Sequence, residues 1–116
     1  MTKLDERLAE MIRGAVQARR EDAVSLLQEL VRTPSVTGEE GAVGEIVERS
    51  FSERGLEVDV WDATPEEIEP YRDHVGEQDS YENRPNVAGV RRGEGGGRSI
   101  LLNAHTDTVD PGDPAA

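Results

Sequence analysis

The first third of the chain repeats apolar residues with the period of a helix. Apolar side chains recur every three or four positions from Leu4 to Val31, so they lie along one stripe of a helical surface. Gly14 interrupts this stripe and is a place where it could divide into two helices. The pattern ends at Pro34, because proline pushes the preceding Thr33 out of the helical backbone region. We therefore predict one or two amphipathic helices before residue 34.

A further helix is predicted after residue 37. Thr37 and Glu40 have the three-residue spacing of a capping box, in which a hydroxyl and a carboxylate satisfy the first free amides of a helix. Gly55 provides a stop signal, because glycine readily adopts the left-handed conformation that ends many helices. The apolar stripe between these two signals consists of Val43, Ile46, Val47 and Phe51.

The second half of the chain has the pattern of short strands. Residues 56–61, LEVDVW, alternate apolar and acidic side chains, as in a strand that is covered on one face. Residues 86–92, NVAGVRR, and 98–104, RSILLNA, are predicted as two strands of a hairpin joined by the glycine-rich residues 93–97. The acidic residues 62–83 show no sustained period and are predicted to form a surface excursion. This order predicts an α/β layer whose sheet is unfinished and exposes an edge.

Candidate chemistry follows the last predicted strand in the sequence His105-Thr106-Asp107. Residues i and i+2 of a strand share a face, so the imidazole and the carboxylate should project together. A neutral imidazole is a good zinc ligand, and a neighbouring carboxylate can orient it. The alternative for His105 is that it is simply a polar residue at the end of the strand. The alternative for Asp107 is that it is an exposed loop residue.

Three other polar residues receive plainer interpretations. Asp110 and Asp113 flank a Pro-Gly pair and are predicted to be turn residues, since their spacing does not match a calcium loop. His74 lies in the acidic excursion without a partner at metal-ligand spacing, and we expect it to be solvated.

Composition narrows the classes of function. The formal charge is −12, and only 34% of the residues are hydrophobic and 3% aromatic, so we expect a loosely folded chain that is prone to associate. The acidity argues against nucleic-acid partners. The chain has no cysteine, which leaves any zinc to histidine and carboxylate ligands. No apolar run is long enough to cross a membrane and none resembles a signal peptide, so we expect no membrane partner and a cytoplasmic location.

Four segments in order resemble a known family. They are LVRTPSVTGEE at 30–40, a helix-like stretch ending in Arg54-Gly55-Leu56, RPNVAGVRRG at 84–93 and GGGRSILLNAHTDTVDPGD at 95–113. Together they resemble the amino-terminal part of the zinc-dependent amidohydrolases and peptidases related to acetylornithine deacetylase and succinyl-diaminopimelate desuccinylase. NAHTDTVDPGD is similar to the first metal motif of that family, although Asp110 precedes Pro111 where Val-Pro is the commoner order.

The resemblance implies a fold, a site and a reaction. Residues 1–116 would form the amino-terminal portion of a three-layer α/β/α zinc-peptidase-like catalytic domain. His105 would bind one of two Zn²⁺ ions, which Co²⁺ could replace, and Asp107 would belong to the catalytic machinery by holding the imidazole ring. The substrate would be a small N-acyl amino acid or peptide, and the parent protein a homodimer.

The same resemblance implies that the chain alone is inactive. The remaining ligands and the general base of the family lie beyond residue 116, whereas a catalytic zinc site needs about three protein ligands. The alternative hypothesis is a non-catalytic acidic module that acts through protein contacts alone.

Overall fold

The computed structural model of the chain describes residues 3–75 and 80–112. The chain divides into two compact units, residues 1–32 and residues 33–116. We call them the helical unit and the sheet unit and describe each by itself.

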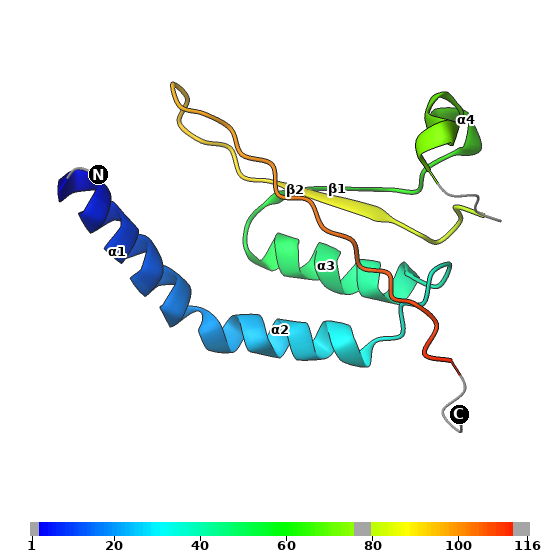
Figure 1. Cartoon of the computed structure of the whole chain (residues 1–116), viewed down its shortest axis with the longest axis horizontal. Helices are drawn as coiled ribbons and strands as arrows, with labels where there is room; N and C mark the ends of the chain where they lie inside the picture. Colours follow the sequence, from blue (N-terminus) through cyan, green and yellow to red (C-terminus); the bar gives the residue numbers. More distant parts are fainter. Residues whose placement is uncertain (1–2, 76–79, 113–116) are drawn as a thin grey trace. The chain divides into compact units, whose positions relative to one another are not determined.

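The helical unit consists of α1, Lys3–Ala18, and α2, Arg20–Arg32 (Figure 1). The stripe forms two helices, one of the two expected arrangements, but the break lies at Arg19 and not at Gly14. Gly14 is inside α1, where its neighbours favour helix strongly enough to offset a cost of about 1 kcal/mol for glycine. The break coincides with a new helix start: acidic residues occupy the first turn of α2, and Asp22 lies 3.6 Å from the guanidinium of Arg19.

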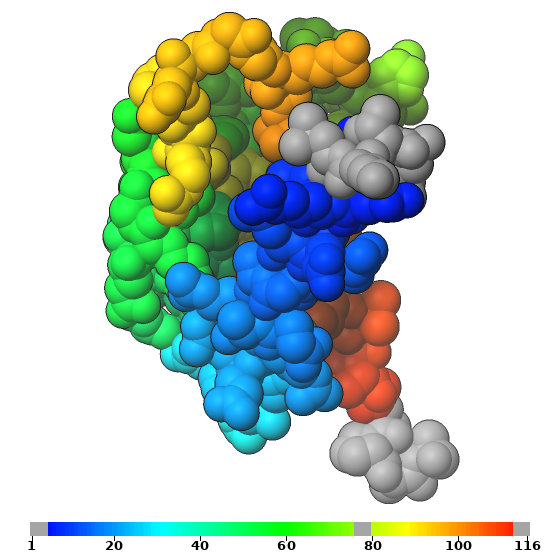
Figure 2. All heavy atoms as spheres, turned by 90° about the vertical axis from the view of Figure 1, so that its left-hand side faces the viewer, coloured from blue at the N-terminus to red at the C-terminus, as the bar shows by residue number. Residues whose placement is uncertain are grey.

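Most of the predicted apolar stripe on these helices is exposed. In the space-filling view of Figure 2 the helical unit is coloured blue to cyan. Met11 is 61% exposed and Val31 77% exposed, and α2 contains no buried residue. The two helices therefore bury little apolar surface within their own unit. None of the helices that the structure describes has both the length and the apolar character needed to cross a bilayer.

The sheet unit is built on α3, Gly41–Glu53, which lies along a two-stranded antiparallel sheet (Figure 1). The strands are β1, Glu57–Trp61, and β2, Asn86–Val90. Val43 and Ile46 of α3 are the buried hydrophobic residues among those described, so the core is small. Helices and a partial sheet are present, as the α/β prediction requires. The three-layer zinc-peptidase fold remains a prediction.

Gly55 ends α3 as predicted. Its φ is +70°, and its amide donates to the carbonyl of Ser52 at 2.9 Å. The amide of Leu56 donates to the carbonyl of Phe51 at 3.1 Å. This pair of bonds is a Schellman motif, which satisfies the last carbonyls of the helix and directs the chain straight into β1.

Two glycines allow the helix and the sheet to pack closely. A Cβ on Gly44 of α3 would overlap Cγ of Pro85, which immediately precedes β2. A Cβ on Gly89 of β2 would lie 2.5 Å from the ring of Phe51 and 2.6 Å from Leu56. The distance between α3 and β2 therefore depends on the absence of side chains at these positions.

The acidic excursion contains regular structure that the sequence analysis missed. It includes α4, Pro65–Ile68, and a 3₁₀ helix η1, Glu69–His74, in which His74 is exposed as expected. Thr64 and Glu67 form a reciprocal capping box, with proline at the first helical position. A capping box, which the sequence predicted before α3, is therefore present before α4.

The predicted hairpin is wrong in its second strand. The chain reverses at the glycine-rich residues 93–97, but residues 98–104 are not part of a strand (Figure 1). Ile100, Leu101 and Leu102 are 84–89% exposed. A continuous apolar run is typical of a strand covered on both faces. Within the sheet unit α3 is the helix that packs against the sheet, so pairing here would bury little of this run.

The close approach of α3 to Pro85 predicts a contrast between two helical glycines. Gly44→Ala should lower the free energy of unfolding by about 1–2 kcal/mol, because overpacking exceeds the gain in helix propensity. Gly14→Ala is the matched control, since a Cβ there meets no atom within 4 Å, and it should leave stability unchanged or raise it. Urea unfolding followed by circular dichroism and Trp61 fluorescence measures both. Equal effects of the two substitutions would contradict this packing.

Candidate functional site

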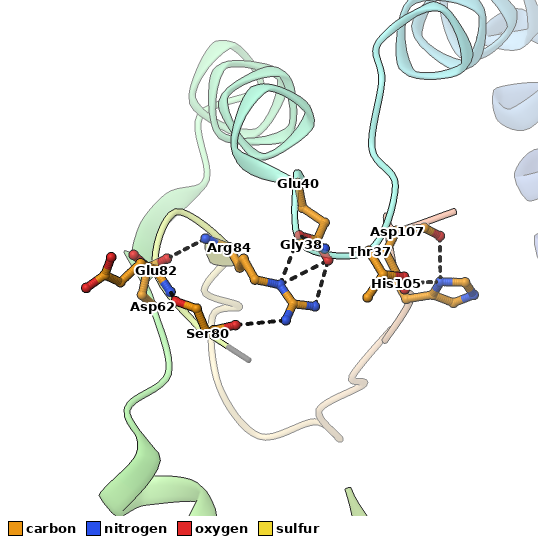
Figure 3. Close-up of polar contacts among 9 residues, drawn as sticks. All are labelled: Thr37, Gly38, Glu40, Asp62, Ser80, Glu82, Arg84, His105 and Asp107. Carbon is orange, nitrogen blue, oxygen red and sulfur yellow. Dashed lines mark hydrogen bonds and ion pairs between the residues drawn. The ribbon is translucent and has the colours of Figure 1, made fainter. Parts of the chain in front are cut away.

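The structure brings His105 and Asp107 together. Nδ1 of His105 lies 2.8 Å from Oδ1 of Asp107 and 3.2 Å from the Asp107 carbonyl oxygen (Figure 3). The His105 side chain is 85% exposed and that of Asp107 is 37% exposed. The sequence predicted this contact for residues at the end of a strand, but residues 105–107 lie in a loop. The contact itself depends on the short reach between positions i and i+2.

Asp107 is held on its other oxygen by a residue from a distant part of the sequence. The hydroxyl of Thr37 donates to Oδ2 of Asp107 at 2.9 Å. This bond from Thr37, followed by that from His105, holds the pKa of the Asp107 carboxyl below its ordinary value. The carboxylate is therefore ionised at neutral pH and accepts a hydrogen bond on each oxygen.

An ionised acceptor determines which ring nitrogen of His105 carries the hydrogen. Because the Asp107 carboxylate can only accept, Nδ1 is the donor of the 2.8 Å contact. In the neutral ring Nε2 is then the nitrogen with a free lone pair. Nε2 makes no hydrogen bond with the residues that the structure describes.

Backbone hydrogen bonds hold the loop with Thr37 next to the loop with Asp107. The amide of Thr37 donates to the carbonyl of Thr108 at 3.2 Å, and the amide of Thr108 donates to the carbonyl of Ser35 at 2.8 Å. Val36 and Thr108 consequently form an isolated parallel bridge. Ser35 is buried, with 4% exposure, so the bridge is attached to the core of the sheet unit.

The predicted capping box of Thr37 and Glu40 is wrong: Glu40 is itself the residue immediately before α3, and its side chain makes no capping hydrogen bond. Its carboxylate forms a two-pronged ion pair with Arg84, with Nη2 to Oε1 at 2.8 Å and Nε to Oε2 at 3.0 Å (Figure 3). The amide of Gly38 also donates to Oε2 at 2.9 Å. Both charged side chains are largely buried, with exposures of 9% and 15%. A strong tertiary partner thus displaces the local capping interaction.

The ionisation of Glu40 follows from these contacts. Burial opposes the charged form, but the hydrogen bonds from Arg84 and the Gly38 amide together outweigh it, and the pKa of Glu40 lies below its ordinary value. The pKa of Arg84 is raised in turn by the hydrogen bond to Glu40. The pair is therefore fully ionised at neutral pH.

Further hydrogen bonds hold Arg84 from the other side. The Asp62 carboxylate accepts from the backbone amides of Asn83 and Arg84, both at 3.1 Å. Nη1 of Arg84 donates to the carbonyl of Ser80 at 3.0 Å (Figure 3). These bonds link the end of β1 to the turn before β2 and set the position from which Arg84 reaches Glu40.

The remaining predicted site residues stay apart from this cluster. Asp110 accepts the Gly112 amide at 2.8 Å, which confirms its role in a turn, and Asp113 lies outside the described residues. Among the residues that the structure describes, no three histidine or acidic side chains converge into a group able to hold a metal ion. The metal-binding role of His105 stays a prediction.

Comparison with known proteins gives a distant match. Succinyl-diaminopimelate desuccinylases from three strains of Cereibacter sphaeroides are each 35% identical to the chain over 95 residues. The similarity is to a hydrolase. The matched region is 82% of the chain but 20% of each relative, so the chain spans about one fifth of the length of the curated relatives it matches. No family model and no solved structure matches the chain.

Sequence reasoning missed three residues that build the site: Thr37, Glu40 and Arg84. Thr37 and Glu40 were interpreted as a local cap, and Arg84 was noted only as part of a matching segment. A signal was present, because LVRTPSVTGEE and RPNVAGVRRG were both among the segments that carry the resemblance. Their pairing in space could not be derived from either segment alone.

The lowered pKa of Glu40 predicts a pH-dependent contribution to stability. The contribution should be complete above pH 4.5, the ordinary value, and lost as the pH falls through the lower pKa of the folded state. Glu40→Gln should reduce the free energy of unfolding by about 1–3 kcal/mol at neutral pH. This deficit should shrink as the pH falls from 4.5 through the lower pKa of the folded state, because the wild-type carboxylate then also becomes neutral.

Urea unfolding between pH 3 and 7, roughly the range that brackets carboxyl titration, measures the deficit. Glu39→Gln is the matched control, since Glu39 is the exposed neighbour of Glu40, and it should have a small effect at all pH values. A deficit for Glu40→Gln that does not change with pH would show that the ion pair does not account for it.

Proposed function

We propose that the chain is the amino-terminal portion of a zinc-dependent hydrolase that cleaves the amide bond of N-acyl amino acids or small peptides. The distant similarity to desuccinylases supports the reaction class. A zinc-peptidase-like catalytic domain, two Zn²⁺ ions in the complete site and a homodimeric parent are parts of the same proposal.

One observation supports this proposal most directly: the hydrogen bond with Asp107 fixes the tautomer of His105. The carboxylate accepts from Nδ1 at 2.8 Å, and Nε2 is left as the nitrogen with an available lone pair. Metal-binding histidines commonly donate their second ring N–H to a carboxylate, which orients the ring and makes it more basic. The donor set therefore fits zinc, with His105 as one ligand and Asp107 behind it.

The described residues supply only part of such a site. A catalytic zinc ion takes about three protein ligands and keeps one position open, whereas one histidine is in place here. In this proposal the other ligands and the general base come from residues outside the described set. When bound, zinc polarises the amide carbonyl and makes water a stronger nucleophile.

Each residue of the cluster has a distinct task in the proposed reaction. His105 binds the metal through Nε2 and remains neutral while bound. Asp107 keeps the proton on Nδ1 and compensates the positive charge that the imidazole shares with the metal. The Glu40–Arg84 pair lies further from the ring and maintains the loop that carries Thr37.

The ligand count predicts that the 116-residue chain alone is inactive. Hydrolysis of N-succinyl and N-acetyl amino acids should not exceed the buffer rate with added Zn²⁺ or Co²⁺, because one histidine cannot retain a catalytic ion. Release of free amine from each substrate provides the measurement. Turnover that a chelator abolishes would show that these residues already contain a complete site.

A longer protein that includes this segment tests the roles of the two residues. His105→Ala should lose zinc and nearly all turnover. Asp107→Asn should retain zinc with about 10–100-fold weaker affinity and turn over slowly, because the ligand is present but its carboxylate partner is not. Zinc content and turnover are measured on the same preparations.

His74→Ala is the matched control, because His74 is the other histidine of the chain and lies exposed in η1. It should leave zinc content and turnover unchanged. Normal zinc and turnover in His105→Ala would refute the proposal. Complete loss of zinc from Asp107→Asn would instead make Asp107 a direct ligand.

A further inference from the structure

The Thr37 hydroxyl connects the loop before α3 to the His105–Asp107 pair. Thr37 and Asp107 are 70 positions apart in sequence, and Oγ1 of Thr37 donates to Oδ2 of Asp107 at 2.9 Å (Figure 3). Oδ1 of the same carboxylate accepts from His105 at 2.8 Å. The three side chains thus form a chain of hydrogen bonds that runs from Thr37 through Asp107 to the imidazole.

This chain of hydrogen bonds restricts rotation of the Asp107 carboxylate and so fixes the orientation of the imidazole ring. A carboxylate bound on one oxygen can rotate about its Cβ–Cγ bond, whereas a carboxylate bound on both oxygens has a fixed plane. The backbone cannot supply this restraint, because the bonds of Thr37 and Thr108 hold the main chain and leave the Asp107 side chain free. The hydroxyl is therefore the group from the 35–37 segment that acts on the carboxylate itself.

We propose that Thr37 is a positioning residue, which holds the plane of the Asp107 carboxylate so that His105 keeps its hydrogen on Nδ1 and presents Nε2 to a metal ion. This inference rests on the proposed function for its biological meaning. Its physical content concerns the tautomer of a single histidine. The tautomer can be measured without metal and without activity.

The experiment compares four chains of 116 residues by nitrogen NMR of the imidazole rings at a pH where both histidines are neutral. The variants are Thr37→Val, which removes the hydroxyl and keeps the branched shape, Thr37→Ser, which keeps the hydroxyl, and Thr108→Val. Thr108→Val is the matched control, because it makes the same chemical change beside Asp107 and keeps the backbone bridge. His74 provides an internal reference in every spectrum.

In the wild type, Nδ1 of His105 should resonate as a protonated nitrogen and Nε2 as an unprotonated one. Thr37→Ser and Thr108→Val should preserve this pattern. Thr37→Val should give averaged signals that approach those of His74, because a rotating carboxylate no longer selects one tautomer. The amide signals of α3, β1 and β2 should be unchanged in all four chains, which separates positioning from folding.

A wild-type pattern retained in Thr37→Val would overturn the positioning role. If Thr37→Val perturbs the amide signals, Thr37→Ala removes the same hydroxyl with less bulk, and an unchanged His105 tautomer in that variant overturns the proposal equally. Mixed tautomers in the wild type or in Thr108→Val would also overturn it.

Titration with Zn²⁺ alone then distinguishes this inference from the proposed function. Zn²⁺ should shift the Nε2 signal of His105 at lower concentration than that of His74, and Thr37→Val should weaken this binding by about tenfold. If the tautomer depends on Thr37 while Zn²⁺ shows no preference for His105, the positioning role holds and the metal function fails.

Discussion

The ion pair between Glu40 and Arg84 is the interaction on which the arrangement of the sheet unit depends. It joins Glu40, the residue immediately before α3, to the turn before β2, through three nitrogen–oxygen contacts of 2.8–3.2 Å between largely buried groups. Removing either partner would leave a buried charge without compensation, which is far more costly than the loss of an exposed pair. The hydrophobic core of Val43 and Ile46 is small, and this polar connection supplements it in holding helix and sheet together.

The same pair also determines where the candidate site can form. Glu40 accepts the amide of Gly38, which holds the loop that carries Thr37, and that loop contacts both the backbone of Thr108 and the side chain of Asp107. The orientation of His105 is thus connected to a buried charge pair through one loop. The exposed imidazole owes its geometry to contacts deeper in the unit, since its own loop has no regular structure.

Sequence patterns predicted the elements that depend on local interactions. The Schellman end at Gly55 and the alternating strand β1 follow from neighbouring residues, and both are present. The predicted capping box of Thr37 and Glu40 was wrong, because the same Thr-x-x-Glu spacing leads to different contacts at its two occurrences. Thr64 and Glu67 form a capping box beside a proline, whereas Glu40 pairs with Arg84. A local motif cannot reveal a competing partner 44 positions away. The contact of His105 with Asp107 was expected for a strand and arises in a loop, because two-residue spacing brings the side chains within reach in both.

Residues 98–107 contain an exposed apolar run and an exposed imidazole, and the same additional layer of protein would cover both. Ile100, Leu101 and Leu102 are exposed although their sequence is typical of a strand covered on both faces. The His105 side chain is 85% exposed, whereas the protein shell around a metal site controls how far solvent reaches the ion. A layer of protein over this segment would bury the apolar run and exclude water from the imidazole together. Under the proposed function, the protein surface that covers this segment would also bring the missing ligands, so burial of the apolar run and assembly of the metal site would become one event.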